Sequence, residues 1–166
     1  DQLQPRRAGT VVLAAALADV TLTESFSDDS LSAQLEQVAS VVAARGTLGS
    51  NRDVFFVELI GFDTHSDMDD TLSGLLGYVN NALGSFVAEM KAQGTWGNVT
   101  IVSASDFGRT LTSNGKGTDH GWGGHTFLMG GAVKGGRIHG QYPRTLGTEE
   151  IREVIPVPPE VPNVDL

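Results

Sequence analysis

Apolar residues recur along the chain at helical spacing in two long stretches. In residues 31–45, and again in residues 69–93, apolar positions return every three or four residues. This spacing places them on one face of an α-helix, so both stretches are predicted to be helical. Residues 10–20, which are rich in Ala and Leu, are predicted to form a further helix.

Three shorter apolar runs lack this spacing and are predicted to be strands. They cover residues 54–60, 99–103 and 126–129. Continuous apolar character over so few residues is typical of strands that are covered on both faces, as in a parallel sheet. The first strand, the long helix and the second strand would form a right-handed βαβ unit. The pattern therefore predicts an α/β fold with a mainly parallel sheet and helices on both faces.

The chain is predicted to form a single α/β domain, residues 1–166, with an irregular tail. Of its 166 residues, 40% are hydrophobic, which is enough to bury one core. Residues 144–166 are rich in Pro, and such a segment is expected to be irregular.

Composition and charge exclude several classes of partner and chemistry. The net charge is -9, from 20 acidic and 11 basic residues. This argues against nucleic acid or an anionic membrane as a partner, because phosphate groups need a basic surface. No apolar run reaches the ~20 residues that a membrane span needs. The chain has no Cys, which excludes disulfides, thiolate nucleophiles and thiolate metal ligands.

Asp and His residues lie at one end of each apolar run. The six candidates are Asp63, His65, Asp106, Asp119, His120 and His125. Because ligands bind beyond the carboxyl ends of strands in open α/β sheets, these side chains are expected to gather at one sheet edge. Carboxylate with imidazole is a ligand set for zinc, manganese or iron, and the oxygen donors alone suit magnesium or calcium.

Each part of this pattern also has a plainer interpretation. An Asp-x-His sequence such as Asp63 to His65 is commonly a turn with a satisfied histidine, and Asp119 can cap a turn in a Gly-rich loop. From the residue types alone, a metal site and a set of ordinary turns both stay open. The joint placement of the six residues is what favours the metal site.

The motifs GFDTH, VTIVSASDFGRT and GTDHGWGGHTFLMGGAVKGG together resemble the C-terminal half of a bacterial secreted family called domain of unknown function 1501. The resemblance covers residues 54–143, and the GTDHGWGGH stretch is its most specific part. That family is similar in turn to the alkaline phosphatase and sulfatase superfamily, through the order and spacing of the motifs. The resemblance implies the C-terminal half of an alkaline phosphatase-like fold and a periplasmic or extracellular location.

The superfamily holds two metal ions at strand ends, and the resemblance implies which residues would bind the first. Asp63 and His65 would serve this ion. A later histidine would complete the site, with His125 as the best fit and His120 as its rival.

The second metal site departs from the superfamily pattern. Asp106 would serve this ion, but Phe107 stands where the superfamily usually has a histidine. A phenylalanine cannot bind a metal. The resemblance therefore implies a second site that is depleted, or one that Asp119 or His120 completes.

The superfamily nucleophile has no counterpart in the sequence. Superfamily hydrolases use a Ser, Thr or modified Cys that follows an early strand, in a chain at least twice as long. No such strand is recognisable here, so the chain resembles a fragment or a shortened relative. Hydrolysis without this nucleophile would have to use a metal-activated water.

The function expected from these features is metal-dependent hydrolysis of phosphate or sulfate esters, on a small-molecule or carbohydrate substrate. Zinc is the first expectation for the divalent metal, with manganese, magnesium and calcium as the others. Arg109 either orients the anionic group or pairs with a surface carboxylate. The alternative is a non-catalytic metal-binding protein, or a truncated domain that lacks the nucleophile.

Overall fold

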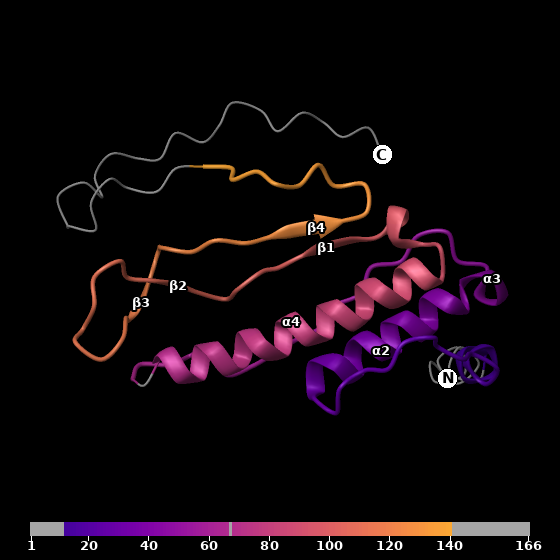
Figure 1. Cartoon of the computed structure of the whole chain (residues 1–166), viewed down its shortest axis with the longest axis horizontal. Coiled ribbons are helices and arrows are strands. Elements are labelled where there is room, and N and C mark those ends of the chain that lie inside the picture. The colour runs from indigo at the N-terminus through magenta and orange to yellow at the C-terminus, as the bar shows by residue number, and fades with distance from the viewer. Residues whose placement is uncertain (1–11, 67, 141–166) are drawn as a thin grey trace, which may run out of the picture.

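The computed structural model describes residues 12–66 and 68–140 (Figure 1). Residues 12–17 are helical, as predicted, although the predicted helix begins outside the described residues. The predicted Pro-rich tail at residues 144–166 also lies outside them. The named elements are α2 (Ser30–Ala43), α3 (Arg45–Leu48), α4 (Met68–Ala92), the 3-10 helix η1 (Trp96–Asn98), β1 (Thr100–Val102), β2 (Gly108–Arg109), β3 (His120–Gly121) and β4 (Leu128–Gly130).

The first helix stripe predicted from the sequence forms α2. Asp29 caps the helix, because its Oδ1 accepts hydrogen bonds from the amides of Leu31 and Ser32 at 3.0 and 2.9 Å. These bonds satisfy donors that have no partner inside the helix. Leu35 and Ala39 follow on the same face and are buried. The prediction of a helix here is confirmed, with α3 as a short continuation.

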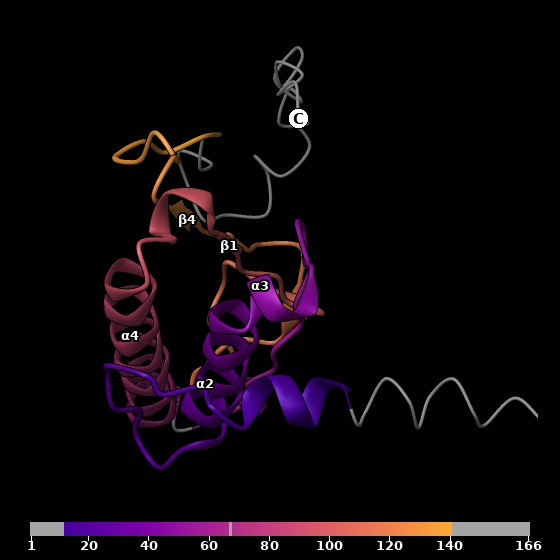
Figure 2. The ribbon, with the colours of Figure 1, turned by 90° about the vertical axis from the view of Figure 1, so that its right-hand side faces the viewer.

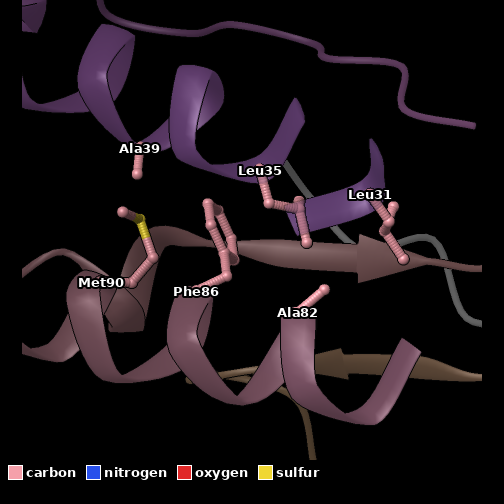
Figure 3. Packing of buried hydrophobic residues seen from close by; sticks show 6 residues of the cluster. All are labelled: Leu31, Leu35, Ala39, Ala82, Phe86 and Met90. Carbon is pink, nitrogen blue, oxygen red and sulfur yellow. The ribbon is translucent and has the colours of Figure 1, made fainter. Parts of the chain in front are cut away.

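The long predicted helix is α4. It packs beside α2, and the two helices run in the same direction. Figure 3 shows Leu35 facing Phe86 and Ala39 facing Met90 at four-residue steps. Both steps follow the helical repeat, so the two stripes stay in contact along their length. Gln93 donates to the Ala39 carbonyl at 3.1 Å and ties the C-terminal parts together. This helix pair holds the hydrophobic core.

The predicted parallel sheet with helices on both faces is wrong. Within the described residues the structure contains two short sheets, each with two antiparallel strands. In the first, β1 pairs with β4 and Ile101 lies opposite Met129. In the second, β2 pairs with β3 and Arg109 lies opposite His120. Figures 1 and 2 show β1 and β4 lying along one side of the α2 and α4 pair.

The predicted strand at residues 54–60 is also wrong, and with it the βαβ unit. This segment is the connection that returns along α2 from one helix to the other, and none of its residues lies in a strand. It is anchored to α2 by Gln34, which bonds both the amide and the carbonyl of Glu58, at 2.9 and 2.8 Å. Residues 54–60 therefore connect two parallel helices and do not form a strand in either sheet.

The apolar run at residues 54–60 is buried on one side only. Val57 and Leu59 pack against the core. Val54, Phe56 and Ile60 point outward and are 95%, 87% and 77% exposed. Continuous apolar character predicts burial on two faces, but in the structure alternate side chains of this segment face solvent.

The other two predicted strands, at residues 99–103 and 126–129, are confirmed as strands, but the prediction that they run parallel is wrong. They form β1 and β4, which pair antiparallel. Val102 and Leu128 are 66% and 56% exposed, so the outer side of this pair is uncovered. Across the described parts of the chain, no helix combines the length and apolar character needed to cross a bilayer.

Candidate metal centre

Two segments that are far apart in the sequence bring the candidate ligands together beside the start of α4. Asp63 and His65 lie in the loop that leads into this helix, and His120 begins β3. The loop before β3 also reaches the helix, since Thr118 Oγ1 lies 3.9 Å from the sulfur of Met68. The site therefore depends on loops held together by contacts distant in sequence.

The pairing of β2 with β3 brings the β3 histidine into place, and it requires glycine. A Cβ on Gly108 would lie 2.7 Å from the carbonyl oxygens of Gly121 and Gly123. No side chain fits in that space, because real Cβ atoms do not approach a backbone oxygen so closely. The close approach of the two strands follows from these glycines.

The central contact of the site is a carboxylate between two imidazoles. Oδ1 of Asp63 lies 2.7 Å from Nε2 of His120 and 3.0 Å from Nε2 of His65. One ligand atom from each of the three residues lies within 4.8 Å of the others. Three donors so close together can hold a metal ion.

A second carboxylate stands behind the first histidine. Oδ1 of Asp119 lies 3.4 Å from Nδ1 of His65, the ring nitrogen that faces away from Asp63. The side-chain Nδ2 of Asn114 donates to the same Asp119 oxygen at 3.0 Å. A carboxylate on the outer nitrogen of a metal-binding histidine commonly fixes its tautomer and orientation. Asp119 occupies that position.

Both carboxyl groups are held in their ionised form. The hydrogen bond from His120 lowers the pKa of Asp63, with a further contribution from His65. The hydrogen bond from Asn114 lowers the pKa of Asp119, again with help from His65. A carboxylate must be deprotonated to act as a metal ligand, and the lowered pKa of each group favours that state.

An aromatic stack orients the third ligand. The ring of Phe107 stacks on that of His120, with centroids 4.0 Å apart and planes at 11°. On the other side, the His65 ring lies 5.2 Å from that of His120. Phe107 cannot bind a metal itself, but its ring supports that of a candidate ligand.

Arg109 lies next to the group but is directed at protein oxygens. Its Nη2 donates to the carbonyl of Phe62 at 2.6 Å, and its Nη1 donates to the carbonyl of Thr118. The guanidinium carbon lies 5.2 Å from the centre of the Phe107 ring. These contacts are with main-chain carbonyls, and the charge of Arg109 adds to the hydrogen bonds from Asn114 and His65 in lowering the pKa of Asp119. Its role toward a substrate anion stays a prediction.

Three of the six predicted ligands lie outside the group of three: Asp119, which contacts the outer nitrogen of His65, and Asp106 and His125. Asp106 is in the loop between β1 and β2, and His125 is in the segment between β3 and β4. The histidine that joins Asp63 and His65 is His120, which the sequence left as a rival of His125. Asn114 was not predicted. The Asn-Gly turn in which it lies, a few residues before Asp119, was the available signal.

The donor set matches a divalent metal. Two imidazoles and a carboxylate are the three protein ligands of many catalytic zinc sites, which keep a fourth position for water or substrate. The side chains of His65, Asp63 and His120 are 54%, 62% and 45% exposed. The site is therefore reachable from solvent, and it is not a closed structural metal site.

Comparison with known proteins gives a family and no characterised relative. A family model described as "Protein of unknown function (DUF1501)" matches residues 12–158. No curated protein and no solved structure matches the chain.

Proposed function

The chain belongs to the DUF1501 family, and we propose that it is a metal-dependent hydrolase of phosphate or sulfate esters. One observation carries the proposal: ligand atoms of Asp63, His65 and His120 lie within 4.8 Å of one another. Zinc is the first candidate for the ion, because two imidazoles and one carboxylate are typical zinc donors. Manganese, magnesium and calcium are the other candidates.

The residues around the ion would have distinct roles. Nε2 of His65, Nε2 of His120 and Oδ1 of Asp63 would bind the metal. Asp119 would hold the His65 ring through Nδ1, and Phe107 would hold the His120 ring by stacking. A bound divalent ion supplies Lewis acidity, which lowers the pKa of water and polarises an ester oxygen.

The ester class is supported by motif resemblance and by the openness of the site. The order of the motifs is similar to that of the alkaline phosphatase and sulfatase superfamily, whose members hydrolyse such esters. An exposed site admits a small-molecule or carbohydrate ester without a rearrangement. The DUF1501 resemblance also supports a periplasmic or extracellular location as part of the proposal.

A second candidate function is metal binding without turnover, and the exposure of the site favours it. All three ligand side chains are about half exposed. Electrostatic stabilisation of a transition state is strongest in a site that excludes water. A site this open fits a metal carrier or sensor as well as it fits a hydrolase.

Metal analysis followed by an ester assay separates the two candidates. Purified protein is loaded with zinc or manganese and assayed on nitrophenyl phosphate and nitrophenyl sulfate, with and without chelator. Turnover that chelator and Asp63→Asn both abolish supports the hydrolase. The matched control is Asp53→Asn, which removes an exposed carboxylate that bonds to Ser50 away from the site and should leave turnover unchanged. Bound metal without turnover supports the binder, and no bound metal removes both.

A further inference from the structure

Arg109 joins the two loops that carry the carboxylates of the proposed metal centre. One guanidinium nitrogen donates to the carbonyl of Phe62, the residue directly before Asp63. The other donates to the carbonyl of Thr118, the residue directly before Asp119. One planar group therefore connects the main chains on which both carboxylates sit.

The main chain of Arg109 is itself fixed. Its amide donates to the Gly123 carbonyl at 2.6 Å, and the Gly123 amide donates back to the Arg109 carbonyl at 2.9 Å. In the β2 and β3 pair, Arg109 lies directly opposite His120. The side chain of Arg109 therefore starts from the backbone position that pairs with His120, the third candidate ligand.

The guanidinium group is poorly placed to bind a substrate anion. Its two terminal nitrogens are directed at carbonyl oxygens, and Nη2 also lies 3.5 Å from Thr64 Oγ1. The Phe107 ring lies 5.2 Å from the guanidinium carbon. To bind a phosphate through Nη2, Arg109 would have to give up its contacts with Phe62 and Thr64 in the loop of Asp63.

We propose that Arg109 is a positioning residue, which sets the distance between the Asp63 loop and the loop of Asp119 and His120. It acts through these residues and does not contact the substrate. The inference rests on the proposed function only in taking the group of three as a metal site, and it does not require hydrolysis. A guanidinium is suited to this role, because its rigid fork reaches two acceptors at once, whereas a lysine ammonium is a single point charge.

The test compares Arg109→Met and Arg109→Lys with the matched control Arg45→Met. Arg45 donates to one carbonyl, that of Val42, at 2.9 Å, outside the candidate site. Zinc affinity is measured by competition with a chromophoric chelator, and coordination geometry by the visible spectrum of the cobalt-loaded protein. Loss of a residue that orients metal ligands weakens metal binding about 10–100-fold. Both Arg109 variants should show this loss with a changed cobalt spectrum, and Arg45→Met should show neither.

Chemical rescue and phosphate binding distinguish positioning from the alternatives. Adding ethylguanidinium to Arg109→Ala should restore part of the zinc affinity and the original cobalt spectrum. Inorganic phosphate should bind zinc-loaded Arg109→Lys as it binds the zinc-loaded unmodified protein. Unchanged zinc affinity and cobalt spectrum with lost phosphate binding would show that Arg109 is an anion clamp, and would overturn the inference.

Failure of the proposed function is distinguishable from failure of this inference. If the unmodified protein binds zinc without turnover, the hydrolase proposal falls, and a tenfold loss of affinity in Arg109→Lys still supports positioning. If it binds no zinc, hydrogen exchange of the metal-free protein decides. The amides of Thr64 and Thr110, which bond to Phe62 and Asp119, should exchange faster in Arg109→Lys than in Arg45→Met. Equal exchange at both amides overturns the inference.

Discussion

Oδ1 of Asp63 lies 2.7 Å from Nε2 of His120, although 57 positions separate the two residues in the chain. Two ligands of a tetrahedral zinc ion, at ordinary bond lengths, lie about 3.3 Å apart. A zinc ion would therefore replace this hydrogen bond after a shift of roughly half an ångström in the site. The distance between Oδ1 of Asp63 and Nε2 of His120 is therefore close to the distance between two ligand atoms of a bound zinc ion.

The choice between the two histidines gives the first prediction. His120→Ala removes a member of the group of three, whereas His125→Ala removes an exposed imidazole outside it. His120→Ala should weaken zinc binding by more than the about 10–100-fold that loss of an outer partner costs. His125→Ala should leave the affinity within about twofold, a change of about 0.4 kcal/mol or less. Zinc competition with a chelator measures both, and a loss in His125→Ala alone contradicts the assignment.

The carboxylate behind His65 gives the second prediction. Oδ1 of Asp119 lies 3.4 Å from Nδ1 of His65 and accepts a hydrogen bond from the side-chain Nδ2 of Asn114. Asp119→Asn should weaken zinc binding about 10–100-fold, because the histidine loses the partner that orients it. Asp53→Asn is the matched control, since Asp53 is an exposed carboxylate that accepts a hydrogen bond from nearby Ser50. Equal affinity in both variants would show that Asp119 has no part in the site.

How far the sequence predicts this structure depends on the range of each interaction. The stripes that form α2 and α4 repeat every three or four residues, so local spacing reveals them. The direction of β1 is set by its pairing with β4, in which Ile101 meets Met129. Periodicity carries no information on that partner, and the same apolar run suits a parallel or an antiparallel sheet.

The candidate site follows the same division. Asp63 and His65 are separated by one residue in the sequence, so a short motif reveals both. His120 and His125 share one Gly-rich loop, and spacing cannot say which of them turns toward Asp63. The register of β2 against β3, with Arg109 opposite His120, decides it. That register depends on backbone contacts that no single motif encodes.

The buried carboxylate Glu89 gives a prediction about pH. Burial alone would raise its pKa, but hydrogen bonds from the Gln93 side chain and from the amides of Glu24 and Thr23 outweigh this and lower the pKa. A carboxyl group whose folded pKa is lowered stabilises the protein above its unfolded pKa, and the stabilisation is lost as the pH falls through the folded value. Glu89 should therefore stabilise the fold at neutral pH and not in strong acid.

Glu89→Gln tests this directly. The variant should lower the free energy of unfolding at pH 7 by about 1.5–3 kcal/mol, the range for hydrogen bonds to a charged group. The difference from the unmodified protein should shrink as the pH falls below the ordinary glutamate pKa of 4.5. Urea unfolding at pH 7 and pH 3 measures it, with Glu36→Gln on the exposed side of α2 as control. A difference independent of pH would exclude the ionised carboxylate as its source.

Two phenylalanines test the packing of the helix pair. Phe86 is 3% exposed in the core and Phe56 is 87% exposed on the return segment. Phe86→Ala should cost about 3–5 kcal/mol of unfolding free energy, and Phe56→Ala should change it by less than about 0.5 kcal/mol. Chemical denaturation gives both values. A cost above about 2 kcal/mol for Phe56→Ala would show that the outer side of residues 54–60 is covered in solution, because only a buried side chain loses so much.

The glycines between β2 and β3 link the backbone to the metal site. A Cβ on Gly108 would lie 2.7 Å from two carbonyl oxygens of the opposite strand, whereas a Cβ on Gly124 would meet its nearest neighbour at 3.7 Å. Gly108→Ala must therefore push β2 away from β3, and with it Phe107 and Arg109 away from His120. Gly124→Ala adds the same methyl group where an ordinary contact accommodates it.

Gly108→Ala should consequently weaken zinc binding while the helix pair stays folded. The rings of Phe107 and His120 would lose their 4.0 Å stack, and the loss of an orienting contact costs about tenfold or more in affinity. Zinc competition and far-ultraviolet circular dichroism are measured together, so that unfolding is not mistaken for a local effect. Gly124→Ala should match the unmodified protein in both measurements. If Gly108→Ala keeps full affinity with an intact fold, the β2 and β3 pair does not position the third ligand, and the site must be held by its loops alone.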